Sequence, residues 1–267
     1  MLAALSASEI ATQSVDARIA ASDPAVSLSR FVDYPQKGLW GDPDFKPNTN
    51  FWLKGVDFSC VSPWNSGGGA LRAGTAISKR HIIFAKHFPL WKGVRILFVG
   101  EDGGVCPCSI EATKVIDKSD IMIGLLNAEL TPNIHPAKIL PADYEKYIGT
   151  GAGLPVVTFN QREEAVVAEL FSIKTNSVFR LIDSHKPFMK TKERKNYCRD
   201  IVGGDSGNPA FLIFQNEPLL LYCLKGPNSG PGLHLYRREI QAAMDELCPG
   251  YKLETFDFEK VRCDDEK

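Results

Sequence analysis

The feature that most constrains the fold is a series of short apolar segments, separated by turn-forming residues, that extends from Phe51 to Tyr236. Many short strands at close spacing are typical of antiparallel β-barrels and sandwiches. The sequence therefore predicts an all-β protein. The expected strands are residues 73–77, 81–85, 94–99, 109–116, 121–126, 154–159, 165–173, 178–182, 210–214, 219–224 and 233–236.

One segment near the C-terminus has helical periodicity instead. Within residues 237–247, Ile240, Met244 and Leu247 recur at the spacing of one helix face. A Pro-Gly pair at 249–250 then ends the predicted helix.

The two ends of the chain differ from its centre. Residues 1–50 are expected to form an N-terminal extension without chemistry, with a short helix over 8–21 and irregular chain over 41–50. Residues 251–267 are expected to form a polar tail, and the basic segment 186–195 a solvated loop.

Composition and charge exclude several kinds of partner and cofactor. The chain has 267 residues and a formal net charge of -1, so there is no electrostatic reason to expect nucleic acid. No apolar run approaches the ~20 residues needed to cross a bilayer, so no membrane span is expected. Cys106 and Cys108 are too closely spaced for a usual zinc site, and neither a metal nor an organic cofactor is expected.

The seven cysteines are an odd number, so at least one thiol stays free unless two chains are linked. The cysteines are expected to be isolated buried or surface thiols, with one or two disulfides as the alternative if the protein is exported. Their pairing and the oligomeric state stay open.

A Gly-rich segment, residues 203–209 (GGDSGNP), carries the candidate nucleophile Ser206. Glycine adopts backbone angles that other residues avoid, so such a turn can present a hydroxyl and aim several N–H groups at one point. Acyl transfer needs both a presented nucleophile and donors for the developing oxyanion.

A candidate base and its orienting carboxylate lie upstream. His87 follows the apolar segment 81–85, where a strand end can face a cleft and the ring would take the proton of Ser206. Asp120 directly precedes another apolar run, so its carboxylate is expected to be partly buried and to accept the second ring N–H of His87. Asp117 is the competing carboxylate. The other four histidines are expected to be structural or at the surface.

The motifs around His87, Asp120 and Ser206 resemble those of the chymotrypsin/trypsin-like serine protease family, in that family's chain order. The resemblance implies two antiparallel six-stranded β-barrels, trypsin-like, with the site in the cleft between them. Residues 51–145 would be the first barrel, with His87 and Asp120. Residues 146–250 would be the second barrel and the C-terminal helix, with Ser206.

The same resemblance implies further roles. The N–H groups of Gly204 and Ser206 would form the oxyanion hole. Asp200 would lie at the floor of the specificity pocket and favour Arg or Lys before the scissile bond, or else pair with Arg199 in a polar loop. The residues expected to bind substrate, by backbone pairing as an added strand or by leaving room for its side chain, are Leu224, Lys225, Gly226 and Gly232.

Several positions depart from the family pattern. Phe88 and Val202 stand where cysteines are usual. Leu224 stands where a small hydroxyl residue usually supports the aspartate, so a hydrogen bond to Asp120 is expected to be missing. No trypsin-like activation sequence is present, so we expect no zymogen switch of that kind and a different partner for Asp205.

The expected function is that of a serine endopeptidase acting on protein or peptide substrates, with an extracellular or periplasmic location implied by the resemblance. A protease-fold binding module that has lost turnover is the alternative. An esterase that uses the same site is a third hypothesis.

Overall fold

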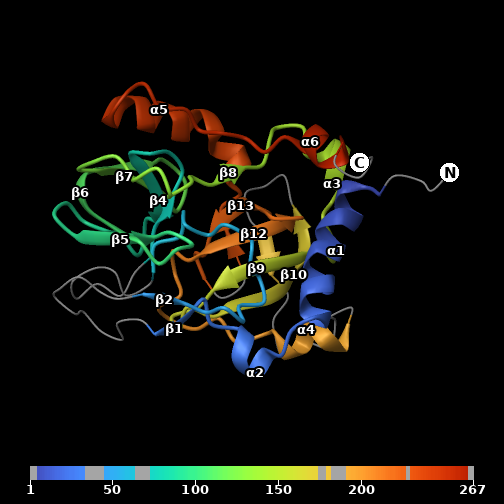
Figure 1. Cartoon of the computed structure of the whole chain (residues 1–267). Helices are drawn as coiled ribbons and strands as arrows, with labels where there is room; N and C mark the ends of the chain where they lie inside the picture. Colours follow the sequence, from blue (N-terminus) through green and yellow to red (C-terminus); the bar gives the residue numbers. More distant parts are fainter. Residues whose placement is uncertain are drawn as a thin grey trace.

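The computed structural model describes residues 5–33, 45–63, 73–173, 179–181, 191–226 and 229–263. The expected β-rich class is confirmed: most regular elements are strands, accompanied by a few helices (Figure 1). The described strands form a five-stranded sheet, a seven-stranded sheet and a two-stranded sheet. The expected pair of six-stranded barrels is therefore not confirmed.

The five-stranded sheet is antiparallel, in the order β3-β4-β7-β6-β5. β4 and β7 are buried along their whole length, as their continuous apolar runs predict. A Cβ at Gly124 of β7 would lie 2.9 Å from the ring of Phe84, so the absence of a side chain lets the strands pair this closely. The strands are β3 (Thr75–Ala76), β4 (His81–Ala85), β5 (Arg95–Val99), β6 (Val105–Ile116) and β7 (Ile121–Leu126).

The seven-stranded sheet has the order β14-β11-β10-β9-β12-β13-β8 and is antiparallel except where β8 pairs with β13. Because β8 begins at Lys138, this sheet starts before the boundary expected at residue 146. Its strands are β8 (Lys138–Ile139), β9 (Pro155–Phe159), β10 (Ala165–Ile173), β11 (Phe179–Leu181), β12 (Pro209–Phe214), β13 (Glu217–Cys223) and β14 (Ser229–Gly230).

β12 lies between two hydrophobic cores. Phe211 and Ile213 face the core that the second sheet shares with the first, whereas Leu212 and Phe214 face a second core on the opposite side. Side chains alternate along a strand, and both sets here are apolar, so β12 is buried on both faces.

Helices cover the sheets. α5 lies over β6 and β7, and α1 runs along the second sheet against β12 (Figure 1). α5 has the predicted bounds, and α1 matches its prediction to within one residue at each end. The helices are α1 (Ala7–Ala20), α2 (Pro24–Ser27), α3 (Glu145–Ile148), α4 (Lys192–Asn196), the 3-10 helix η1 (Leu233–Tyr236), α5 (Arg237–Leu247) and α6 (Phe258–Cys263), and the small sheet pairs β1 (Phe31–Asp33) with β2 (Lys46–Pro47).

Residues 233–236 were expected as a strand, and this expectation is wrong because they form η1, which leads directly into α5. A four-residue apolar run has no periodicity that separates a strand from a buried helical turn. The polar tail is also more firmly attached than expected. Phe256 and Phe258 are buried, with ring centroids 4.9 and 5.3 Å from that of Phe214.

The basic segment also differs from expectation where it is described. Arg194 in α4 is buried and pairs with Asp16 of α1 and Glu169 of β10. Residues 186–190 of this segment lie outside the described part of the chain.

Candidate active site

The pairing of β4 with β7 brings His87 and Asp120 together. Ala85, the last residue of β4, is opposite Ile121, the first residue of β7. The N–H of Lys86 donates to the backbone carbonyl of Asp120 at 3.0 Å, which extends the ladder by one step. Residues far apart in sequence therefore leave the same end of the sheet side by side.

The side chains of Ser206, His87 and Asp120 form a continuous chain of hydrogen bonds. His87 Nδ1 lies 2.6 Å from Asp120 Oδ2, and His87 Nε2 lies 2.9 Å from Ser206 Oγ. The backbone N–H of His87 also donates to Asp120 Oδ1 at 2.9 Å. An ionised carboxylate is only an acceptor, so Nδ1 carries the proton and Nε2 is free to accept one from the serine.

Asp120 and His87 differ in how far their side chains are exposed to solvent. The Asp120 side chain is 9% exposed, whereas that of His87 is 41% exposed. The carboxylate is thus largely shielded from water while the imidazole stays open to a substrate.

The loop that carries Ser206 is tied to the second sheet. The N–H of Gly207 donates to the carbonyl of Leu224, and the N–H of Leu224 donates to the carbonyl of Asn208, both at 2.8 Å. Gly207 has φ +89°, and a Cβ there would lie 3.4 Å from the carbonyl oxygen of Ala73. Glycine fits this point because the backbone is left-handed and approaches another segment closely.

Asp205, next to the serine, anchors the same loop from inside. Its buried carboxylate accepts the N–H of Gln161 at 3.0 Å and that of Val202 at 2.8 Å. Burial raises the pKa of Asp205, and these two donors act in the opposite direction. The Gln161 side chain also donates to the carbonyl of Gly203 at 2.8 Å. No sequence pattern pointed to Gln161.

Leu224, at the position where the resemblance implies support for Asp120, instead packs in the second core. The preceding residue, Cys223 at the end of β13, is the one whose pKa the charge of Asp120 affects. Burial, and then the charge of Asp120, raise the pKa of the Cys223 thiol to about 12. This thiol therefore stays protonated, and its Sγ lies 3.9 Å from the carbonyl oxygen of Ile83.

The expected oxyanion residues lie at the start of this loop. Gly204 has φ +104°, and the N–H of Ser206 has no acceptor among the described residues. An N–H that has no acceptor among the described residues and lies next to a serine hydroxyl can donate to a charge that develops on a bound molecule.

The backbone expected to pair with a substrate strand is already hydrogen-bonded within the chain. The N–H of Leu224 donates to Asn208, and those of Lys225 and Gly226 donate to the carbonyl of Ser229 at 2.8 and 3.3 Å. Gly232 is buried and caps the start of η1.

Asp200 and His87 line different cavities. Asp200 lines one of about 380 Å³ with Gln161, Arg199 and Asp205 among its neighbours. The cavity that contains His87 has about 410 Å³ and is lined by Lys86, His87, Lys118, Ser119, Asp120, Lys225, Pro231 and Tyr236.

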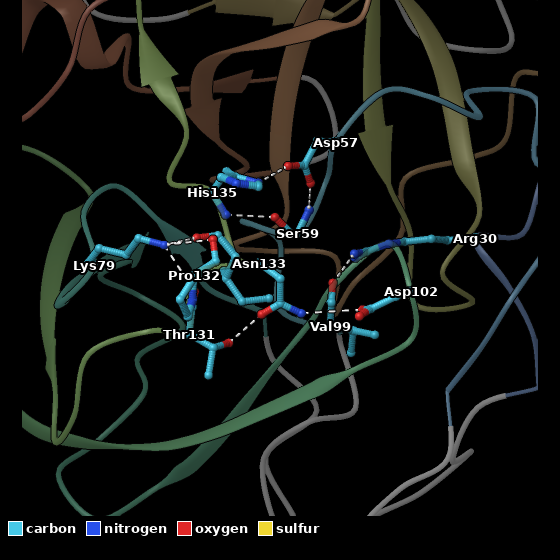
Figure 2. A network of polar contacts seen from close by, with 11 residues as sticks. Arg30, Asp57, Ser59, Lys79, Val99, Asp102, Thr131, Pro132, Asn133 and His135 are labelled. Atoms are coloured by element: carbon cyan, nitrogen blue, oxygen red, sulfur yellow. Dashed lines mark hydrogen bonds and ion pairs between the residues drawn. The ribbon is translucent and has the colours of Figure 1, made fainter.

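His135 and Asp57 form a second His–Asp pair. The ring of His135 bonds Asp57, and its backbone N–H donates to Ser59 Oγ (Figure 2). The second of these hydrogen bonds is 2.9 Å long. The N–H of Ser59 in turn donates to Asp57 at 2.7 Å. Among the described residues no hydroxyl contacts the outer ring nitrogen of His135. The side chain is 67% exposed, and the pair fixes a loop.

The described residues contain no group of three His, Cys, Asp or Glu side chains placed to hold a metal ion. Five of the described cysteines, Cys60, Cys106, Cys108, Cys223 and Cys248, form no disulfide. None of the described helices has the length and apolar character required to span a bilayer.

No protein-family model matches this chain, and the curated proteins contain no match to it.

Proposed function

We propose that this protein is a serine endopeptidase that hydrolyses protein or peptide substrates through an acyl-enzyme intermediate. The observation that carries the proposal is the imidazole of His87, bonded to Asp120 on one nitrogen and to Ser206 on the other. This arrangement couples a nucleophile, a base and an orienting carboxylate in one hydrogen-bonded line.

In the proposed reaction, Ser206 Oγ attacks the carbonyl carbon of the scissile bond while His87 Nε2 takes the hydroxyl proton. Asp120 holds the ring in the required tautomer and stabilises the imidazolium. His87 then gives the proton to the departing amine, which leaves an ester on Ser206. A water molecule, deprotonated by the same ring, hydrolyses that ester.

The negative charge on the substrate oxygen would be met by backbone N–H groups at Ser206 and Gly204. We also propose that the five-stranded and seven-stranded sheets form two barrels, which face each other across the site. We do not extend the proposal to a preference for Arg or Lys, because Asp200 lines a cavity other than that of His87.

A fluorophosphonate probe tests this proposal, because it labels only a serine whose hydroxyl is activated. We expect covalent labelling of the native protein, loss of labelling in Ser206→Ala, and retention in Ser109→Ala, which removes a serine outside the site. Cleavage of a peptide library should show the same dependence. Absence of labelling in folded protein would favour the inactive binding module, and ester hydrolysis without peptide cleavage would favour an esterase.

A further inference from the structure

The cavity that contains His87 is rich in positive charge. Lys86 precedes the histidine, Lys118 lies in the turn between β6 and β7, and Lys225 follows β13. All three lysines are exposed at the cavity. Segments from both sheets therefore bring three lysines to the lining of one cavity.

The described lining of this cavity contains more basic than acidic side chains. Among the described lining residues the one carboxylate is Asp120, which is already bonded to His87. None of the three lysines forms an ion pair with a described residue. The positive charge is local, because the chain as a whole has a formal net charge of -1.

Lys118 adds an independent observation. Its backbone has φ +58°, a left-handed conformation that asparagine and glycine adopt with less strain. The turn is fixed by Ser119, whose Oγ donates to the carbonyl of Ile116 at 2.9 Å and accepts the N–H of Ile121 at 3.1 Å. This turn fixes where the Lys118 backbone lies, at the edge of the cavity that His87 also lines.

We propose that the enzyme selects acidic peptides, with Asp or Glu side chains next to the scissile bond that pair with Lys86, Lys118 and Lys225. This inference rests on the proposed endopeptidase function and names its substrate class. Carboxylates would form charge-assisted hydrogen bonds with the lysines, and the uncompensated charge would speed the approach of an acidic chain.

The test compares fluorogenic peptides of one sequence in which the residues flanking the scissile bond are Glu, Gln or Lys. We expect the Glu peptides to have the highest kcat/KM, and the advantage to shrink in 0.5 M salt because exposed charges are screened. Lys86→Gln, Lys118→Asn and Lys225→Gln should each lower kcat/KM for the Glu peptide by about two- to fivefold. Lys118→Asn also suits the left-handed backbone, so this variant should fold at least as well as the native chain.

The matched control is Lys195→Gln, which removes an exposed lysine of α4 outside the cavity and should leave the preference unchanged. Equal cleavage of Glu and Gln peptides, or a preference for Lys, would overturn the inference while leaving the protease proposal intact. Binding of the same peptides to Ser206→Ala, measured by fluorescence anisotropy, gives a readout without turnover. If the native protein neither cleaves peptides nor takes the probe, the protease proposal fails, and tighter binding of the Glu peptide would still support the lysine site.

Discussion

At the residue scale, both carboxylate oxygens of Asp120 accept hydrogen bonds from His87. Oδ1 accepts the backbone N–H of His87 and Oδ2 accepts its ring N–H. The first bond sets where the histidine backbone lies, and the second sets which ring nitrogen carries the proton. An asparagine at this position can supply only one of these two acceptors.

Asp120→Asn should therefore trap the wrong tautomer. If the amide oxygen keeps the backbone N–H, its NH₂ group faces Nδ1, and the ring must carry its proton on Nε2, where it cannot accept one from Ser206. We expect kcat to fall by about 10⁴-fold. Steady-state kinetics on a cleaved peptide measure this loss, and circular dichroism checks that the fold is kept. Retention of more than a tenth of the native kcat would show that Asp120 has no such role.

At the element scale, α1 is attached to the second sheet by a buried ion-pair cluster. The guanidinium of Arg194 in α4 bonds both oxygens of Asp16 at 2.7 and 2.8 Å and Glu169 of β10 at 2.7 Å. Arg194 and Glu169 side chains are each 1% exposed, whereas Asp16 is 33% exposed. Removal of the arginine would leave the buried Glu169 without this counter-charge.

Arg194→Met should destabilise the protein by about 3–5 kcal/mol, because a buried charge that loses its partner is costly. The double variant Arg194→Met/Glu169→Leu should recover part of that loss, since it removes both charges and keeps apolar volume. Urea unfolding followed by tryptophan fluorescence measures both free energies. Equal stabilities of native and Arg194→Met proteins would mean that the cluster does not hold α1 in place.

The elements that sequence patterns predicted well are those in which local and tertiary preferences agree. β4, β7 and β10 have their predicted bounds, and in β4 and β7 this is because apolar runs match strands that are buried along their whole length. Patterns failed at η1, because a four-residue apolar run is too short to show a period. They failed at Arg194 because the residues that bury it, Asp16 and Glu169, come from distant segments.

The candidate site shows the same division. His87, Asp120 and Ser206 were identifiable because each flanks an apolar strand in a recognisable order. The link from Asp205 to Gln161 was not, because it joins two loops that only the folded sheets bring together. Lys86 and Lys118 were visible beside His87 and Asp120, but their shared cavity depends on how β4, β7 and β13 meet.

At the scale of the whole molecule, two buried histidines tie folding to pH. His81 lies in the first sheet, and His234 lies in η1 between the second sheet and α5. Burial, as the main cause, lowers the pKa of each to about 4, from an ordinary 6.5. Both are therefore neutral in the folded protein at pH 5, whereas the unfolded chain binds protons there.

Stability should consequently be highest above pH 6.5 and should fall as pH drops from 6.5 towards 4, because the unfolded state binds more protons over that range. Asp205 acts with the opposite sign, since burial raises its pKa from 3.8. Because one carboxyl group opposes two histidines, we expect the histidines to set the direction in which stability changes with pH. We expect the urea midpoint to decrease steadily between pH 7 and pH 4.5, with a shallower decrease in His234→Phe, which keeps an aromatic ring against Tyr144. A midpoint that stays level or rises on acidification would show that these rings are protonated as readily in the folded chain as in the unfolded one.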